Sequence, residues 1–200
     1  VFDYGRRDNG IYPDKELGRA ALRAARPGVC PLGARGAGRS ATVGKTFDFE
    51  GVEQSGQGGA FRRLGETRIA VFTVVNAIGA VVDRDGTVVR GHLDEATGTR
   101  HALVPRIEER LTAGVPARTP SGNTTLTVVV TNQQLDARLL RTLGRQVHAS
   151  MARAIQPFHA LVDGDVLFAI STNEVEEELG SIELGVVASE LAWDAALSCF

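Results

Sequence analysis

Three short runs of apolar, mostly β-branched residues limit how this chain can fold. They occupy residues 69–75, 126–130 and 166–170, and each has the length and composition of a buried strand. Runs this apolar need cover on both faces, but the helices predicted in this chain could cover only the outer one, so we expect one face of the sheet to be exposed. Strands separated by helical segments that pack on their outer faces predict a layered α/β sandwich.

Helical spacing of apolar residues marks the segments that could supply those outer layers. Pro13 and the acidic residues after it begin the first segment, and Asp136 can cap the second. The predicted helices cover residues 14–25, 136–155 and 182–197, with a shorter one around 105–111. Residues 80–82 and 87–89 form a predicted hairpin across an Asp-Arg-Asp-Gly turn.

A candidate nucleophile lies where a small polar run, Ser121-Gly122-Asn123, changes abruptly into the second β-branched run. If the bond between Asn123 and Thr124 is cut, Thr124 carries a free α-amine beside its own hydroxyl. That amine has a pKa of about 8, so it can accept the hydroxyl proton near neutral pH. The alternative is structural, because two threonines also suit the start of an ordinary strand.

Four other residues could carry chemistry at such a site, and each has an alternative structural interpretation. Asp163 and Asp165 stand two apart before a strand, so both carboxylates could share one face, although Asp-Gly-Asp is also a common turn. Lys45 could donate to a developing oxyanion, or it could be a surface lysine. Asn76 interrupts an apolar run and could be a second oxyanion donor or a satisfied residue at a strand end.

Charge and cysteine content exclude several classes of function. A net charge of −2 argues against a nucleic-acid surface, and the longest apolar run is too short and too polar to span a membrane. Two cysteines, Cys30 and Cys199, are too few for a disulfide framework and favour a reducing cytoplasm. Neither they nor His148 and His159 have the spacing of metal ligands, so no metal or cofactor is expected.

A glycine-rich segment, residues 33–45, is similar to a phosphate-binding loop only superficially. Gly44 and Lys45 are followed by a threonine, but Arg39 occupies the position where that motif needs its first glycine. A nucleotide site is therefore not predicted here.

Four segments together resemble the nylon-oligomer hydrolases, which are 6-aminohexanoate-oligomer endohydrolases among the self-cleaving β-aminopeptidases and D-aminopeptidases. The segments are residues 13–22, 56–65, 122–125 and 155–159, so the resemblance runs over nearly the whole chain. It implies an α/β fold, the αββα four-layer sandwich of N-terminal-nucleophile hydrolases. It also implies a precursor that cuts itself into α and β chains, here residues 1–123 and 124–200 of one domain.

The resemblance assigns roles to the candidate residues. Thr124 matches the nucleophile, Asp163 and Asp165 match the acidic pair that supports it, and Lys45 and Asn76 match the lysine and asparagine of the site. Phe2 falls where the family has a tyrosine that lines the site, so one hydroxyl hydrogen bond to substrate would be lost. The family's long N-terminal part has no counterpart in this sequence, which leads us to expect a partial domain.

The sequence therefore predicts an amide hydrolase that cuts itself between Asn123 and Thr124 and acts on nylon-type oligoamides. The resemblance also implies a homo-oligomer, a tetramer in the family. Two alternatives stay open: a peptidase for β- or D-amino-acid peptides, and an uncleaved, inactive homologue or fragment.

Overall fold

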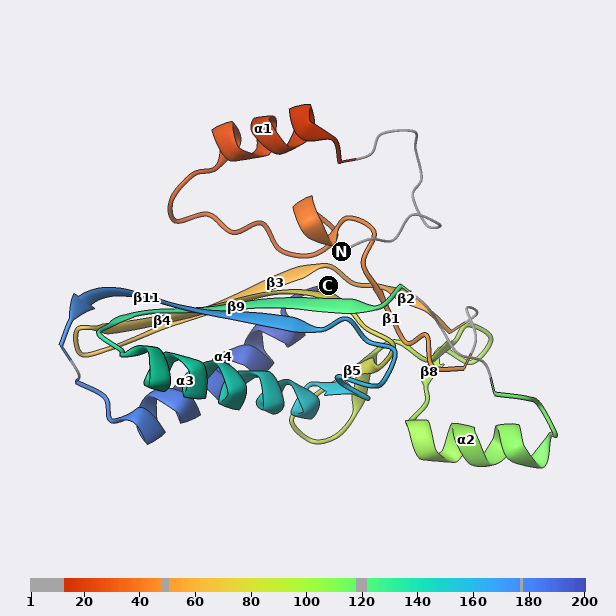
Figure 1. Ribbon diagram of the computed structural model, residues 1–200. Helices are drawn as coiled ribbons and strands as arrows, with labels where there is room; N and C mark the ends of the chain where they lie inside the picture. Colours follow the sequence, from red (N-terminus) through yellow and green to blue (C-terminus); the bar gives the residue numbers. More distant parts are fainter. Residues whose placement is uncertain (1–12, 48–50, 118–121, 177) are drawn as a thin grey trace.

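The computed structural model describes residues 13–47, 51–117, 122–176 and 178–200, and its centre is a four-stranded sheet (Figure 1). The strand order is β11-β9-β4-β3, with β9 and β11 parallel and the other pairs antiparallel. The strands are β3 (Gln57–Leu64), β4 (Thr67–Asn76), β9 (Thr124–Gln133) and β11 (Val166–Val175). The three predicted apolar runs are therefore adjacent strands of one sheet.

Two helices cover one face of this sheet, α3 (Ala137–Ser150) and α4 (Ser181–Leu197), as Figure 1 shows. The core lies between them and the sheet, and its strand residues alternate with half-exposed ones, as one-sided burial requires. Val71 and Val129 on the sheet and Val147 and Leu191 on the helices are at most 1% exposed. Each such side chain contributes about 1.5–3 kcal/mol through removal from water.

Smaller elements surround the sheet. Asp14 caps α1, accepting a hydrogen bond from the backbone N–H of Leu17 at 2.8 Å. The predicted hairpin is present as β5 and β6. The remaining elements are α1 (Lys15–Ala24), η2 (Gly36–Gly38), β1 (Thr42–Val43), β2 (Glu53–Gln54), β5 (Ala80–Val82), β6 (Val88–Arg90), β7 (Leu93–Asp94), β8 (Thr99–Arg100), α2 (Leu103–Thr112), η3 (Met151–Arg153) and β10 (Ile155–Gln156).

The predicted second helix was too long. It was expected to run to residue 155, but α3 ends at Ser150 and continues as the single 3-10 turn η3. Ile155 instead begins β10, which pairs with β5 in a separate three-stranded sheet. The apolar spacing continues past the helix end because Met151, Ala154 and Ile155 are all buried in the same core. They lie in the 3-10 turn, at its end and in a β-strand, respectively.

In the described part of the chain the apolar strands are covered on one face only, as the small number of predicted helices led us to expect. On the face opposite α3 and α4, Phe72 is 39% exposed and Phe168 is 56% exposed. The helix α1 lies over this side of the sheet in Figure 1, but none of its residues is buried. The four-stranded sheet thus has a helical layer on one face and an open apolar face on the other.

Candidate active site

Thr124 begins β9 and lies opposite Asn76, the last residue of β4, in antiparallel register. Its side chain is half-buried, and its hydroxyl donates a hydrogen bond to the carbonyl oxygen of Asn123 at 2.6 Å. Gly122, with a φ of 79°, takes the left-handed conformation that turns the chain into the strand. The hydroxyl therefore lies directly beside the peptide bond that the sequence predicts to be cut.

The Asn76 side chain is completely buried and connects this junction to Lys45. Its Oδ1 accepts hydrogen bonds from Lys45 Nζ at 2.5 Å and from the backbone N–H of Thr42 at 3.1 Å. Its Nδ2 therefore points the other way and donates to the carbonyl oxygen of Gly122 at 3.0 Å. In the intact chain Asn76 is a satisfied strand-end residue that fixes the segment before Thr124.

Gly44 allows the lysine to reach this buried position. It has a φ of 80°, and a Cβ there would come within 2.4 Å of the backbone nitrogen of His92. The backbone N–H of Lys45 donates to the carbonyl oxygen of Ile78 at 2.7 Å, next to the end of β4. Lys45 is only 5% exposed, so the structural alternative of a surface lysine is wrong.

The two predicted aspartates lie beside the same junction, on the approach to β11. Asp163 is in parallel register with Asn123, and its Oδ2 accepts a hydrogen bond from the backbone N–H of Ala160 at 2.9 Å. Asp165 Oδ1 accepts one from the backbone N–H of Thr125 at 2.5 Å. In the intact chain, Asp165 therefore holds the residue next to Thr124 rather than the Thr124 nitrogen.

Several polar atoms around the junction are buried without a hydrogen-bond partner in the described part of the chain. They are Asp163 Oδ1, Thr125 Oγ1 and both side-chain polar atoms of Asn123. Burial raises the pKa of Asp163, and the charge of Asp165 adds to this, against the opposing effects of the Ala160 N–H, His159 and Lys45. Unsatisfied polar groups and a perturbed carboxyl in one place are typical of functional sites.

Sequence reasoning missed Gly164. Its backbone N–H donates a hydrogen bond to the carbonyl oxygen of Asn123 at 2.9 Å, so it contacts the bond predicted to be cut. The only available signal was a glycine between two acidic residues, which equally indicates a turn. The contact depends on the pairing of segments about forty positions apart, and the pattern of residues does not contain that pairing.

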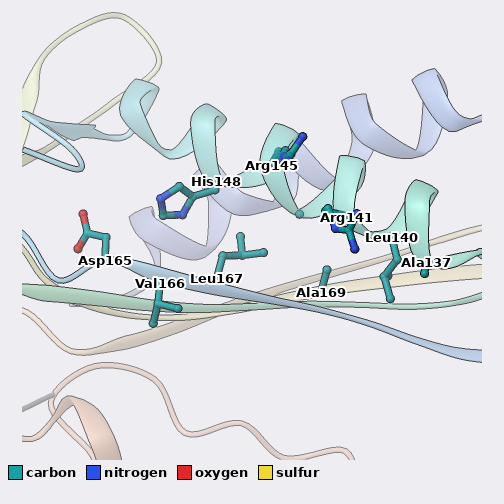
Figure 2. A pocket seen from close by; sticks show the side chains of 10 residues that line it. Ala137, Leu140, Arg141, Arg145, His148, Asp165, Val166, Leu167 and Ala169 are labelled. Atoms are coloured by element: carbon teal, nitrogen blue, oxygen red, sulfur yellow. The ribbon is translucent and has the colours of Figure 1, made fainter.

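A groove of about 510 Å³ lies behind the site, between α3 and β11, and Figure 2 shows its lining. His148 and Asp165 lie at one end of it, on the side of the sheet that faces the helices. Burial lowers the pKa of His148, and the nearby His159 lowers it further, while Asp165 opposes both. Of the predicted catalytic residues, Asp165 lines this groove. Thr124 does not, because side chains alternate along β9 and that of Thr124 points to the opposite, open face of the sheet.

The structure therefore brings Lys45, Asn76, Asn123, Thr124 and the acidic pair together at one end of the sheet. Phe2 lies outside the described residues. Among the described residues there is no group of three or more His, Cys, Asp or Glu side chains that could hold a metal ion. In that same part of the chain, no helix has both the length and the apolar character needed to cross a membrane.

Comparisons with known proteins agree on one family. Residues 9–198 match the family model described as peptidase family S58. The chain is 45% identical to a 6-aminohexanoate-oligomer endohydrolase of Paenarthrobacter ureafaciens and 45% identical to one of Agromyces sp. strain KY5R. Each alignment covers 98% of this chain, which spans 58% of the length of either relative.

Two solved structures share the fold. The L-aminopeptidase D-Ala-esterase/amidase of Ochrobactrum anthropi, described as a variant of the Ntn hydrolase fold, aligns with a TM-score of 0.56 and 16% identity over 90% of this chain and 47% of its own. A Burkholderia sp. β-aminopeptidase aligns with a TM-score of 0.58 and 17% identity over 92% of this chain and 50% of its own. The predicted fold class is thereby confirmed.

Proposed function

The chain belongs to peptidase family S58, and on that premise we propose that it is an N-terminal-nucleophile amide hydrolase acting on nylon-type 6-aminohexanoate oligomers. The observation that carries the proposal is the contact between the Thr124 hydroxyl and the Asn123 carbonyl oxygen at 2.6 Å. The identity to two named 6-aminohexanoate-oligomer endohydrolases supports the choice of substrate.

Self-cleavage comes first in this proposal. The Thr124 hydroxyl attacks the Asn123 carbonyl carbon, and the single domain becomes an α chain ending at Asn123 and a β chain beginning at Thr124. Asn76 supports this step because its amide holds the Gly122 carbonyl oxygen, which fixes the peptide segment next to the attacking hydroxyl. The new α-amine of Thr124 then becomes the base that the hydroxyl lacked.

In the mature enzyme, Thr124 attacks an amide carbonyl of the oligomer, and water hydrolyses the resulting acyl-enzyme. Asp163 and Asp165 lie beside the position where the amine forms and would orient it. Lys45 and Asn76, joined by their 2.5 Å hydrogen bond, would polarise the reacting carbonyl once cleavage frees the segment that Asn76 now holds.

The first alternative is a peptidase for β- or D-amino-acid peptides, and the two aminopeptidase structures that share the fold favour it. The second is an inactive homologue that is never cut. The proposal also includes assembly of the α and β chains into a homo-oligomer, a tetramer by resemblance to the family. It includes a cytoplasmic location too, which rests on the use of only two cysteines.

The test is a change of one residue, Thr124→Ala, measured by intact mass. We expect the unaltered chain to give two species, residues 1–123 and 124–200, and the variant to give a single chain with no hydrolysis of linear 6-aminohexanoate oligomers. Comparison of these oligomers with β-alanyl and D-alanyl peptides separates the two enzymatic alternatives. Cleavage at this bond in the alanine variant, or an unaltered chain that is never cut, would refute the mechanism.

A further inference from the structure

The carbonyl oxygen of Asn123 receives hydrogen bonds from two different segments. One comes from the Thr124 hydroxyl, and the other from the backbone N–H of Gly164 at 2.9 Å. The second donor is held in place by the parallel bridge between Asn123 and Asp163, which sets the two backbones side by side. Gly164 therefore contacts the carbonyl that must become a tetrahedral oxyanion during self-cleavage.

Neighbouring donors are directed at other acceptors. The Asn76 amide, which sequence reasoning offered as an oxyanion donor, donates to the carbonyl oxygen of Gly122. The backbone N–H of Thr125 donates to Asp165 Oδ1. The Thr124 hydroxyl loses its own hydrogen bond to this oxygen when it turns to attack the carbon. The Gly164 N–H can stay in place through the reaction.

We propose that the backbone N–H of Gly164 is a catalytic group of the self-cleavage reaction, which stabilises the negative charge on the Asn123 oxygen. This inference rests on the proposed function. The Thr124 oxygen bonds to the Asn123 carbon, the carbon–nitrogen bond breaks, and the hydroxyl proton ends on the released Thr124 amine. Water then hydrolyses the ester, which leaves a carboxylate on Asn123 and restores the Thr124 hydroxyl.

The distance suits this role. A donor positioned about 2.7–3.1 Å from the oxyanion, within a preformed backbone, lowers the barrier without reorganisation during the reaction. The removal of one such donor typically slows a reaction by about 100- to 1,000-fold. The Gly164 N–H, fixed at 2.9 Å from the Asn123 carbonyl oxygen, meets this geometric requirement.

The glycine itself is needed for space rather than for an unusual backbone angle. A Cβ at position 164 would come within 2.9 Å of Thr124 Oγ1, closer than side chains normally approach. Its φ lies outside the left-handed region, in contrast with Gly122 at 79°. A side chain would therefore push on the attacking hydroxyl, so the spacing of Asp163-Gly164-Asp165 serves the nucleophile as well as the two carboxylates.

The decisive experiment replaces Gly164 with glycolic acid, which changes the backbone N–H to an ester oxygen and adds no bulk. We expect self-cleavage, followed by intact mass, to slow by about 100- to 1,000-fold. The matched control is the same replacement at Gly98, whose N–H donates to the Asp94 carbonyl oxygen at 2.8 Å in an exposed turn. The control should cleave at the unaltered rate.

The outcomes separate this inference from the function on which it rests. If the unaltered chain is cut and the Gly164 ester variant is cut equally fast, only the role of Gly164 is refuted. If the unaltered chain is never cut, the proposed function and this inference both fail. Circular dichroism and thermal unfolding must show that the ester variant is folded before its rate is compared.

A second variant protects the test against loss of folding in the first. Gly164→Ala keeps the N–H but places a methyl group against the Thr124 hydroxyl, so it should also slow cleavage. Addition of Thr124→Ser, which removes the γ-methyl group and lets the hydroxyl rotate more freely, should recover part of the rate. Cleavage of Gly164→Ala at the unaltered rate would show that the close packing around the nucleophile is unimportant.

Discussion

At the scale of single residues, Asp163 is held in a costly state. One of its carboxylate oxygens accepts a hydrogen bond from Ala160, and the other is buried without a partner in the described part of the chain. Burial raises its pKa above the ordinary value of 3.8, so the ionised form is less stable in the folded chain than in the unfolded one. Such a group is retained for function rather than for stability.

The replacement Asp163→Asn should therefore stabilise the fold while it damages the proposed activity. Because the folded pKa is raised, the energetic cost of the aspartate is absent below about pH 4, grows as pH rises, and is complete above the folded pKa. In a Thr124→Ala background, which stays uncut, we expect a gain of about 0.5–2 kcal/mol in the free energy of unfolding at neutral pH.

The measurement is denaturant unfolding at several pH values with Asp136→Asn as the control. Asp136 lies at the exposed N-cap of α3, where an asparagine caps equally well, so the control should change little at any pH. A gain for Asp163→Asn that persists unchanged at acidic pH would show that ionisation of Asp163 is not its cause.

Some residues of the candidate site could be identified from the chemistry of their side chains, and others only from their contacts in the folded structure. Thr124, with its hydroxyl beside a possible new amine, and the acidic pair stood out because their side chains suggest a reaction. Asn76 was left between two interpretations, and only its hydrogen bond to the Gly122 carbonyl shows what it does in the intact chain. Gly164 has no side chain to suggest a role, and its contribution exists only through backbone pairing.

At the scale of elements, the strands and helices that bury a continuous apolar face could be predicted from the sequence. The strands β1 and β2 could not, because they have two residues each and their pairing is fixed by contacts with other segments. Glu53 on β2 accepts hydrogen bonds from Arg100 on β8 and from the backbone N–H of Gly91, at 2.7 Å each. The buried carboxylate of Glu53 thus joins three segments. No apolar pattern in the sequence around it predicts this position.

The Glu53 carboxylate also supports the site. It lies on β2, which pairs with β1, and β1 leads directly to Lys45. Burial alone would raise the pKa of Glu53, but the hydrogen bonds from Arg100 and Gly91 and the charge of Arg90 hold it below its ordinary value. A depressed pKa means that the stabilisation is present above about pH 4.5 and is lost as the pH falls through the folded pKa.

We expect Glu53→Gln to lower the free energy of unfolding at neutral pH by about 1.5–3 kcal/mol, the range for hydrogen bonds to a charged group. It should also slow self-cleavage, because the pair of strands β1 and β2, which positions Lys45, becomes less rigid. The control is Glu66→Gln, which removes an exposed ion pair with Arg63 and should cost less than about 1 kcal/mol. Equal effects of the two variants in chemical denaturation would show that the Glu53 cluster has no special role.

At the scale of the whole molecule, the sheet has two unlike faces. The face toward α3 and α4 is buried, whereas the other exposes apolar side chains that lie in register across neighbouring strands. Phe72, Val128 and Phe168 form one such row, and Ala70, Val130 and Ile170 form the next. By strand alternation Thr124 belongs to this open face, so the proposed nucleophile and the exposed apolar surface share one side of the sheet.

Contiguous apolar surface of this kind drives association between copies. We therefore expect residues 1–200, in the uncut Thr124→Ala form, to gain apparent mass with rising concentration in analytical ultracentrifugation and to bind a hydrophobic dye. The double variant Phe72→Lys/Phe168→Lys places two charges in the centre of the open face and should reduce both signals. Val186→Lys, at a 53% exposed position on α4 across the molecule, should leave both unchanged. A chain that stays monomeric at every concentration and binds no dye would show that this face is not available for association.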